Sequence, residues 1–126
     1  MKKIIFLKIL LLLSGDLFAE PGAATAAEIA HLLAYVNKSN CQYERNGDFH
    51  NAQEAVEHIS DKYEYYEDDI KTAEDFIEYS ATKSVLSGKY YRIHCPTQQP
   101  VKSADWLLDE LKRYRQTKAK ASTSNK

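Results

Sequence analysis

Several features that would assign a function directly are missing from this chain. Its 126 residues carry 17 basic and 18 acidic side chains, so there is no basic excess to neutralise nucleic-acid phosphates. The zinc-protease motif His-Glu-x-x-His and the phosphate loop Gly-x-x-x-x-Gly-Lys-Ser/Thr are both absent. We therefore expect no nucleic-acid partner, no metal ion and no cofactor, and spacing alone identifies no catalytic residue.

Long hydrophobic runs are also missing. The apolar run from Ile4 to Leu13 is broken by Lys8 and is shorter than the roughly 20 residues of a membrane-spanning helix. Two lysines precede it and a small residue, Ala19, follows it, as in a secretory signal peptide. We expect residues 1–19 to be that peptide. Cleavage after Ala26 and a retained membrane anchor are the alternatives, whereas a lipoprotein anchor is not expected because no cysteine follows the run.

The mature chain has the length of one small domain. Removing residues 1–19 takes away three lysines and one aspartate, which changes the formal charge from −1 to −3. We expect a single globular domain over residues 25–115, with no stable membrane insertion after signal cleavage. Residues 116–126 are basic and have few apolar side chains, which predicts a disordered tail.

Cysteine is scarce, because Cys41 and Cys95 are the only two in the chain. An exported protein meets oxidants, so the pair predicts one disulfide. A redox pair, a metal site and two buried free thiols are the other interpretations.

Four stretches have the periodicity of amphipathic helices. They are expected to begin at or just after Thr25, Asn51, Thr72 and Ser103, and Thr25 with Glu28 has the pattern of a capping box. The apolar stripes that would form the core are Ile29, Leu32, Leu33 and Val36; Ala52, Ala55, Val56, Ile59, Tyr63 and Tyr66; Ala73, Phe76, Ile77 and Ala81; and Ala104, Leu107, Leu108, Leu111 and Tyr114.

Two shorter segments, "CQYER" and "KYYRIHC", are rich in strand-forming residues, and each contains a cysteine. If a disulfide brings them together antiparallel, Tyr43 lies beside Ile93. The turn at residues 45–47 then lies against residues 87–89. The predicted fold class is therefore α+β: a small single domain of about four helices packed around a two-stranded antiparallel element, with one disulfide.

Three segments carry a resemblance to a known family. The segments "CQYERNGDFHNAQEAVEHISDKY", "TAEDFIEYSATKSVLSGKYYRIHC" and "WLLDELKRYR" are similar to the YfeK-like family of small exported proteobacterial proteins, a domain of unknown function. The resemblance extends from about Ile29 to Arg115. It implies a periplasmic, single-domain protein, and it provides no catalytic residue.

The histidines are candidate residues for acid–base or metal chemistry. His50, Glu54 and His58 are spaced by four residues, but His50 precedes the expected helix cap at Asn51 and would not share the helix geometry. We interpret them as a turn histidine, a capping glutamate and a histidine flanking the apolar face.

The polar and aromatic residues near the two turns form a candidate binding surface. Trp106 points away from the leucine stripe of its helix, so it either packs against the preceding loop, the role we favour, or is an exposed anchor. The candidate surface consists of Arg45, Asn46, His58, Lys62, Ser87, Lys89, Tyr91 and Trp106.

The function predicted from the sequence is that of a non-enzymatic, periplasmic binding or accessory protein of the cell envelope. Its expected partner is a periplasmic protein or a cell-wall glycan. The alternatives are a cell-envelope hydrolase that uses His58 with Glu54, and an inhibitor of an exported hydrolase.

Overall fold

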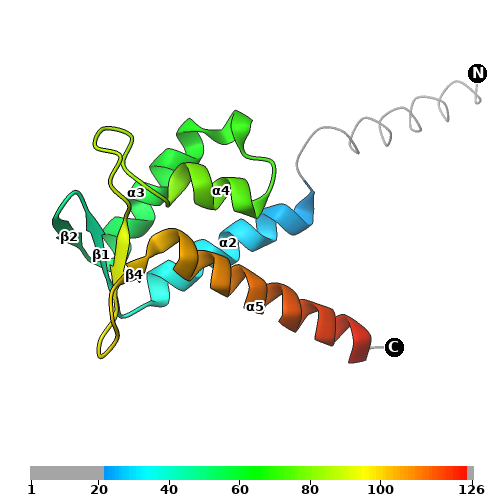
Figure 1. Ribbon diagram of the computed structural model, residues 1–126. Helices are drawn as coiled ribbons and strands as arrows, with labels where there is room; N and C mark the ends of the chain where they lie inside the picture. The colour runs from blue at the N-terminus through cyan, green and yellow to red at the C-terminus, as the bar shows by residue number, and fades with distance from the viewer. Residues whose placement is uncertain (1–21, 125–126) are drawn as a thin grey trace, which may run out of the picture.

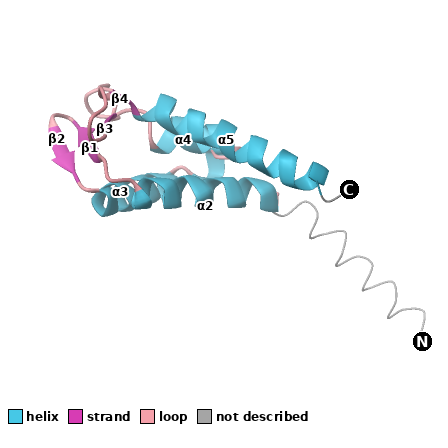
Figure 2. Cartoon of the chain, turned by 90° about the horizontal axis from the view of Figure 1, so that it is seen from below, coloured by secondary structure: helices cyan, strands magenta, loops and turns pink. Residues whose placement is uncertain are grey.

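A computed structural model describes residues 22–124, which form a bundle of helices with a small sheet at one end (Figures 1 and 2). The helices are α2 (Ala23–Lys38), α3 (Ala52–Tyr65), α4 (Ala73–Ser80) and α5 (Ser103–Ser124), and a short 3-10 helix, η1 (Glu67–Asp69), joins α3 to α4. The strands are β1 (Gln42–Arg45), β2 (Asp48–His50), β3 (Arg92–His94) and β4 (Val101–Lys102). The predicted signal peptide lies outside the described residues.

The core lies where the four helices meet each other and the inner face of the sheet. The predicted stripe of α4 is buried, and so is that of α2 except for Leu33, which is partly buried. On α5 Leu107 and Leu111 are buried whereas Leu108 is exposed. The buried apolar residues are Ile29, Leu32, Val36, Tyr43, Ala55, Ile59, Ile70, Ala73, Phe76, Ile77, Ala81, Tyr91, Ile93, Leu107 and Leu111. Among the described residues, no helix is both long and apolar enough to cross a membrane.

Two of the predicted helix starts are confirmed with their caps. The Asn51 side chain accepts a hydrogen bond from the Glu54 backbone N–H at 2.8 Å, and the Glu54 carboxylate accepts one from the Asn51 backbone N–H at 2.9 Å. Thr72 and Asp75 make the same reciprocal pair at the start of α4. The capping box predicted at Thr25 is wrong, because α2 begins at Ala23 after Gly22 without a side-chain cap.

The predicted disordered tail is also wrong for residues 116–124. Helix α5 continues through this segment to Ser124 and extends beyond the other helices (Figure 1). The segment has few apolar residues, but glutamine, lysine and alanine have high intrinsic helix propensity. These residues therefore prolong a helix that has already begun, although they bury little surface.

The two predicted strands pair as expected, but the sheet to which they belong has four strands and not two. Strands β1 and β3 are antiparallel with Tyr43 opposite Ile93, and Cys41 and Cys95 form the predicted disulfide with their Cα atoms 4.2 Å apart. Strand β2 adds to β1 on one side and β4 adds to β3 on the other, so the antiparallel sheet has four strands in the order β2-β1-β3-β4.

The tight corner between β1 and β2 is made by Asn46 and Gly47. Both have positive φ, 54° and 84°, which is the backbone of a type I′ hairpin turn. Glycine adopts this conformation without strain, and asparagine tolerates it better than most residues. The corner is therefore narrow, and it directs the Asn46 side chain toward another part of the chain.

Candidate functional site

The candidate site is a pocket formed by three segments that are far apart in the sequence. They are the β1–β2 turn, the exposed flank of α3, and a loop that we call the 82–91 hairpin. The hairpin is closed by backbone hydrogen bonds from Tyr91 to Thr82 at 3.0 Å and from Ser84 to Lys89 at 3.0 Å. The pocket between these segments, here the hairpin pocket, has a volume of about 200 Å³, and its lining residues are Arg45, Asn46, His58, Lys62, Ser84, Val85, Leu86 and Tyr91.

Hydrogen bonds hold the β1–β2 turn against the 82–91 hairpin. The Asn46 amide N–H donates to Ser84 Oγ at 3.2 Å, and the Ser87 hydroxyl donates to Asn46 Oδ1 at 2.5 Å. Lys62 Nζ on α3 donates to the Lys83 carbonyl at 3.0 Å. The predicted meeting of the two turns is confirmed, and the hairpin is attached to both neighbouring elements.

His58 lies at the centre of the pocket wall, between Arg45 and Tyr91. Arg45 Nη1 is 2.6 Å from His58 Nδ1 and 3.2 Å from Nε2. A guanidinium can only donate, so we assign Nδ1 as the acceptor and place the ring proton on Nε2, which faces Tyr91 Oη at 3.2 Å. In this arrangement His58 is a neutral imidazole that orients the arginine.

The charges around His58 favour the same neutral form. Burial, followed by the positive charges of Arg45 and Lys62, lowers the pKa of His58 from 6.5 to about 4. The ring is only partly buried, and the two cations oppose its protonation. His58 is therefore uncharged near neutral pH.

Tyr91 and Lys62 complete the polar wall. The tyrosine is 2% exposed, and its Oη receives hydrogen bonds from Lys62 Nζ and from the His58 ring, both at 3.2 Å. Burial raises the pKa of the Tyr91 phenol, and burial together with Arg45 lowers the pKa of Lys62. The phenol is therefore protonated near neutral pH, so its oxygen accepts from two neighbours while its own proton remains available.

The two cations of the pocket have no acidic partners. Among residues 22–124 the ion pairs join His31 and Arg113 to Glu110, His94 to Glu44, and Arg115 to Glu28 and Glu74, and none includes Arg45 or Lys62. Two neighbouring, partly buried cations without a carboxylate repel each other. The pocket is therefore a local positive site in a protein with a negative net charge.

The structure brings some of the predicted surface residues together and leaves others apart. Arg45, Asn46, His58, Lys62 and Tyr91 line the hairpin pocket. Ser87 is beside the pocket and contacts two of its lining residues, Asn46 through its hydroxyl and Ser84 through its backbone N–H.

The other two predicted residues do not line the pocket. The side chain of Lys89 is exposed on the hairpin. Trp106 is partly buried and packs against the core and against Tyr35 of α2, with ring centroids 4.5 Å apart. Trp106 is therefore packed, and the ring contact that the structure shows is with Tyr35 of α2; packing against the preceding loop stays a prediction.

Three pocket residues were not on the predicted surface: Ser84, Val85 and Leu86. Ser84 is buried, whereas Val85 is 72% exposed and Leu86 is 97% exposed. Two neighbouring aliphatic residues in a short segment that also has serine and glycine are a weak sequence signal. Only the closed hairpin places them at the pocket.

Of the three residues His50, Glu54 and His58, the predicted capping role of Glu54 is confirmed, whereas the prediction of His50 as a turn histidine is wrong because it is the last residue of β2. Glu54 caps α3, His50 lies in β2 and His58 faces the pocket. Within residues 22–124 no hydrogen bond joins Glu54 to His58, and no three ligating side chains are grouped to hold a metal ion.

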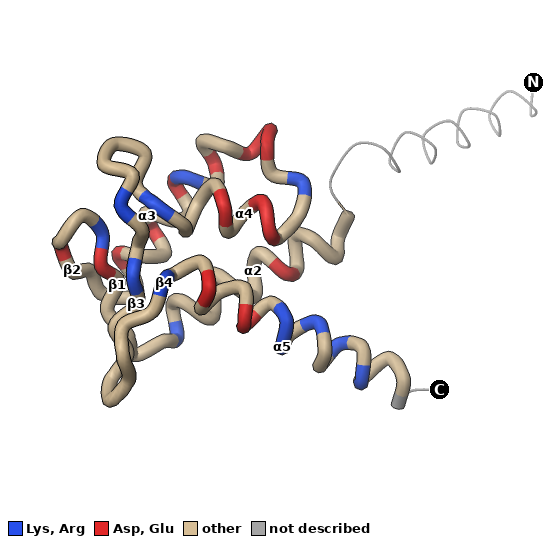
Figure 3. The backbone as a smooth tube through the Cα atoms, in the orientation of Figure 1, with Lys and Arg blue, Asp and Glu red and all other residues tan. Residues whose placement is uncertain are grey.

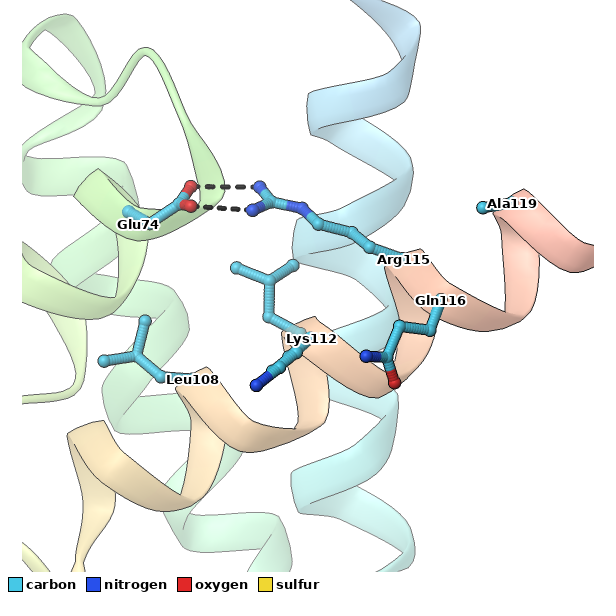
Figure 4. Close-up of a pocket in the computed structure, with 7 residues that line it drawn as sticks. Glu74, Leu108, Lys112, Arg115, Gln116 and Ala119 are labelled. Carbon is cyan, nitrogen blue, oxygen red and sulfur yellow. Dashed lines mark hydrogen bonds and ion pairs between the residues drawn. The ribbon is translucent and has the colours of Figure 1, made fainter.

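A second, wider depression lies between α4 and α5 and has a volume of about 400 Å³. One of its two basic side chains, Arg115, is already paired with Glu74 through two hydrogen bonds of 2.7 and 3.0 Å (Figure 4) and also pairs with Glu28; the other basic side chain is Lys112. Across the fold, basic residues gather near the base of the 82–91 hairpin and along the outer half of α5 (Figure 3). The lining of this groove includes the acidic side chain Glu74, whereas among the described residues no acidic side chain lines the hairpin pocket.

Comparison with known proteins places the chain in a family. Residues 23–115 match the Family of unknown function (DUF5329), and the chain is 40% identical over 92 residues to the uncharacterised protein YfeK of Salmonella typhimurium. That alignment covers 72% of this chain and 77% of the relative. No solved structure matches the chain. The match spans all four helices up to Arg115 and the whole sheet, so the chain belongs to this family of unknown function, in agreement with the YfeK-like resemblance of its sequence.

Proposed function

We propose that the protein is an exported, non-enzymatic binding protein of the cell envelope, and that the hairpin pocket is its binding site. The observation that carries the proposal is the presence of two cations, Arg45 and Lys62, that face an open pocket and have no acidic partner among residues 22–124. A binding partner would supply the missing countercharge. The export part rests on the signal-peptide pattern of residues 1–19 and on the disulfide.

Several contacts favour binding over catalysis. The ring of His58 is held between Arg45 and Tyr91 by hydrogen bonds. Glu54, the acid expected to assist it in a hydrolase, is engaged at the helix cap. A hydrolase would need His58 to exchange protons with a substrate, whereas here it orients a cation.

Affinity capture tests the proposed site. The mature protein is immobilised and exposed to periplasmic proteins and to solubilised cell-wall fragments from a bacterium that makes a family member. We expect wild type to retain a specific protein or glycan and an Arg45→Gln/Lys62→Gln variant to lose it. Lys89→Gln is the matched control, because it removes an exposed basic charge from the same hairpin outside the pocket.

The proposal expects the double variant and Lys89→Gln to differ in whether they retain the partner. If the double variant retains the same partners as wild type, the hairpin pocket is not the binding site. If Lys89→Gln loses them as well, the binding is a general charge effect of this face rather than a property of the pocket. Fractionation of cells that express the full chain tests export, and a protein that stays in the cytoplasm with its N-terminus intact would contradict that part.

A further inference from the structure

We propose that the hairpin pocket binds one oxyanionic group, a phosphate or a carboxylate, on a molecule whose apolar part lies against Val85 and Leu86. This inference rests on the proposed function, because it names the class of ligand for the same site. It follows from an inventory of hydrogen-bond donors and acceptors and from the position of the exposed aliphatic side chains.

The polar groups of the pocket have more donors than acceptors. Tyr91 Oη already receives hydrogen bonds from Lys62 and His58, so its lone pairs are used and its proton has no acceptor within residues 22–124. Ser84 Oγ receives hydrogen bonds from the Asn46 amide at 3.2 Å and from the Ser87 backbone N–H at 3.4 Å. Both hydroxyl groups are therefore left as donors.

The two cations add further donors. Arg45 uses only Nη1 for its hydrogen bond to His58 Nδ1, so the N–H groups of Nη2 and Nε have no acceptor in the described part of the chain. Lys62 Nζ donates to the Lys83 carbonyl and to Tyr91, which leaves its third N–H. Four side chains from three segments thus present unused donors at one pocket.

An oxyanion is the partner that satisfies this arrangement. A phosphate or a carboxylate offers several acceptor lone pairs and a negative charge, and the planar fork of arginine binds both in a bidentate manner. A neutral acceptor would satisfy the donors but would leave the two cations without a countercharge. Because His58 is neutral, it keeps Arg45 in place without adding a third charge.

The apolar part of the ligand is inferred from the hairpin tip. Val85 and Leu86 line the same pocket and are 72% and 97% exposed, so they offer an apolar surface directly beside the donors. A free inorganic ion would leave this surface in water. A molecule that carries its oxyanion on an apolar body would cover it and gain burial free energy.

Titration calorimetry at low ionic strength with simple probes tests the inference. The probes are inorganic phosphate and acetate, their apolar counterparts hexyl phosphate and hexanoate, and 1-hexanol as an uncharged molecule with the same tail. We expect saturable binding of at least one apolar oxyanion, about tenfold tighter than its small counterpart because part of the tail is buried. Tighter binding of hexyl phosphate would identify a phosphate as the source of the oxyanion, and tighter binding of hexanoate would identify a carboxylate.

Matched variants separate the two halves of the site. Arg45→Gln/Lys62→Gln should weaken the charged probes at least tenfold, and Lys62→Gln alone should weaken them measurably if the double variant does not fold. Lys89→Gln should bind as wild type does. Val85→Ser/Leu86→Ser should remove the advantage of the hexyl probes and leave inorganic phosphate or acetate unchanged.

Two results would overturn the inference: no saturable binding of any oxyanion, or binding of 1-hexanol as tight as that of the charged hexyl probes. If the oxyanions fail while partner capture still depends on Arg45 and Lys62, the ligand class is wrong and the proposed function stands. If the oxyanions bind but capture is the same for wild type and double variant, the pocket takes an oxyanion and is not the partner site.

Discussion

Protonation of His58 should destabilise the fold, and this effect tests the electrostatics of the hairpin pocket independently of any ligand. The unfolded chain binds a proton at this histidine near pH 6.5, whereas in the folded protein the pKa of His58 is lowered to about 4. The unfolded state therefore binds more protons between these two values. The stability contributed by neutral His58 is present in full above pH 6.5 and is lost as the pH falls toward 4.

The magnitude follows from the shift and from the exposure of the ring. Each pKa unit corresponds to about 1.4 kcal/mol, so a fully sealed site would lose about 3 kcal/mol. The His58 ring is only partly buried, and water screens its repulsion from Arg45 and Lys62. We therefore expect a loss of about 1–2 kcal/mol.

Denaturant unfolding of wild type and His58→Gln between pH 4.5 and 8 measures the effect. Glutamine keeps a side-chain acceptor for Arg45 but does not titrate, and the other three histidines are present in both proteins. The free energy of unfolding of wild type minus that of the variant should be constant above pH 7 and should fall below pH 6.5. The groups that act on His58 are Asp61 and Lys62 on its own helix α3, Arg45 on β1, His50 on β2, and Tyr91 before β3.

A direct measurement decides whether Arg45 adds to the effect of burial in lowering the pKa of His58. In an NMR titration the ring of His58 should titrate near pH 4 in wild type and in Lys89→Gln, and at a higher pH in Arg45→Gln. A constant difference in stability across the pH range, together with a His58 pKa near 6.5, would refute the assignment of a neutral histidine held between two cations.

Much of the helical part of the fold was predictable because it depends on local sequence patterns. The apolar stripes of α2 and α4 and the capping boxes at Asn51 and Thr72 depend on residues a few positions apart. The cysteine pair then supplied one long-range restraint. That restraint was enough to align Tyr43 with Ile93.

The outer strands could not be found in the same way. Strand β2 has three residues and β4 has two, which is too short for an alternating pattern to be distinguished from a loop. The Asn46-Gly47 pair was itself a hairpin signal, and it should have predicted a returning strand at Asp48–His50. The outer half of α5 was predicted to be disordered because it lacks apolar periodicity. Its helix depends instead on the intrinsic helix propensity of its residues.

The candidate site was predictable only in outline. Arg45 and His58 were expected near the two turns, but their contact depends on the distance between β1 and α3, which the packing of the core sets. Ser84 becomes a pocket residue because the hairpin folds back and Asn46 reaches it. No local pattern encodes that meeting, since the two residues are 38 positions apart.

Three further predictions follow from the contacts outside the pocket. Replacing both cysteines by alanine should lower the free energy of unfolding by about 4 kcal/mol in the chain-entropy model, because the disulfide joins positions 54 residues apart; denaturant unfolding of the variant, or of reduced wild type, measures the loss. Asn51→Ala should cost about 1 kcal/mol through loss of the capping box, whereas Asn51→Ser should retain most of that stability, and equal losses in the two variants would show that the cap is not the cause. Arg115→Ala should cost about 1 kcal/mol, because one guanidinium makes paired hydrogen bonds to glutamates on both α2 and α4 and so holds α5 to the bundle. Lys112→Ala removes a charge one turn earlier on the same helix and should cost less. The cost of Arg115→Ala should shrink in 1 M salt; if it stays the same there, the loss comes from side-chain packing along α5 and not from the ion pairs.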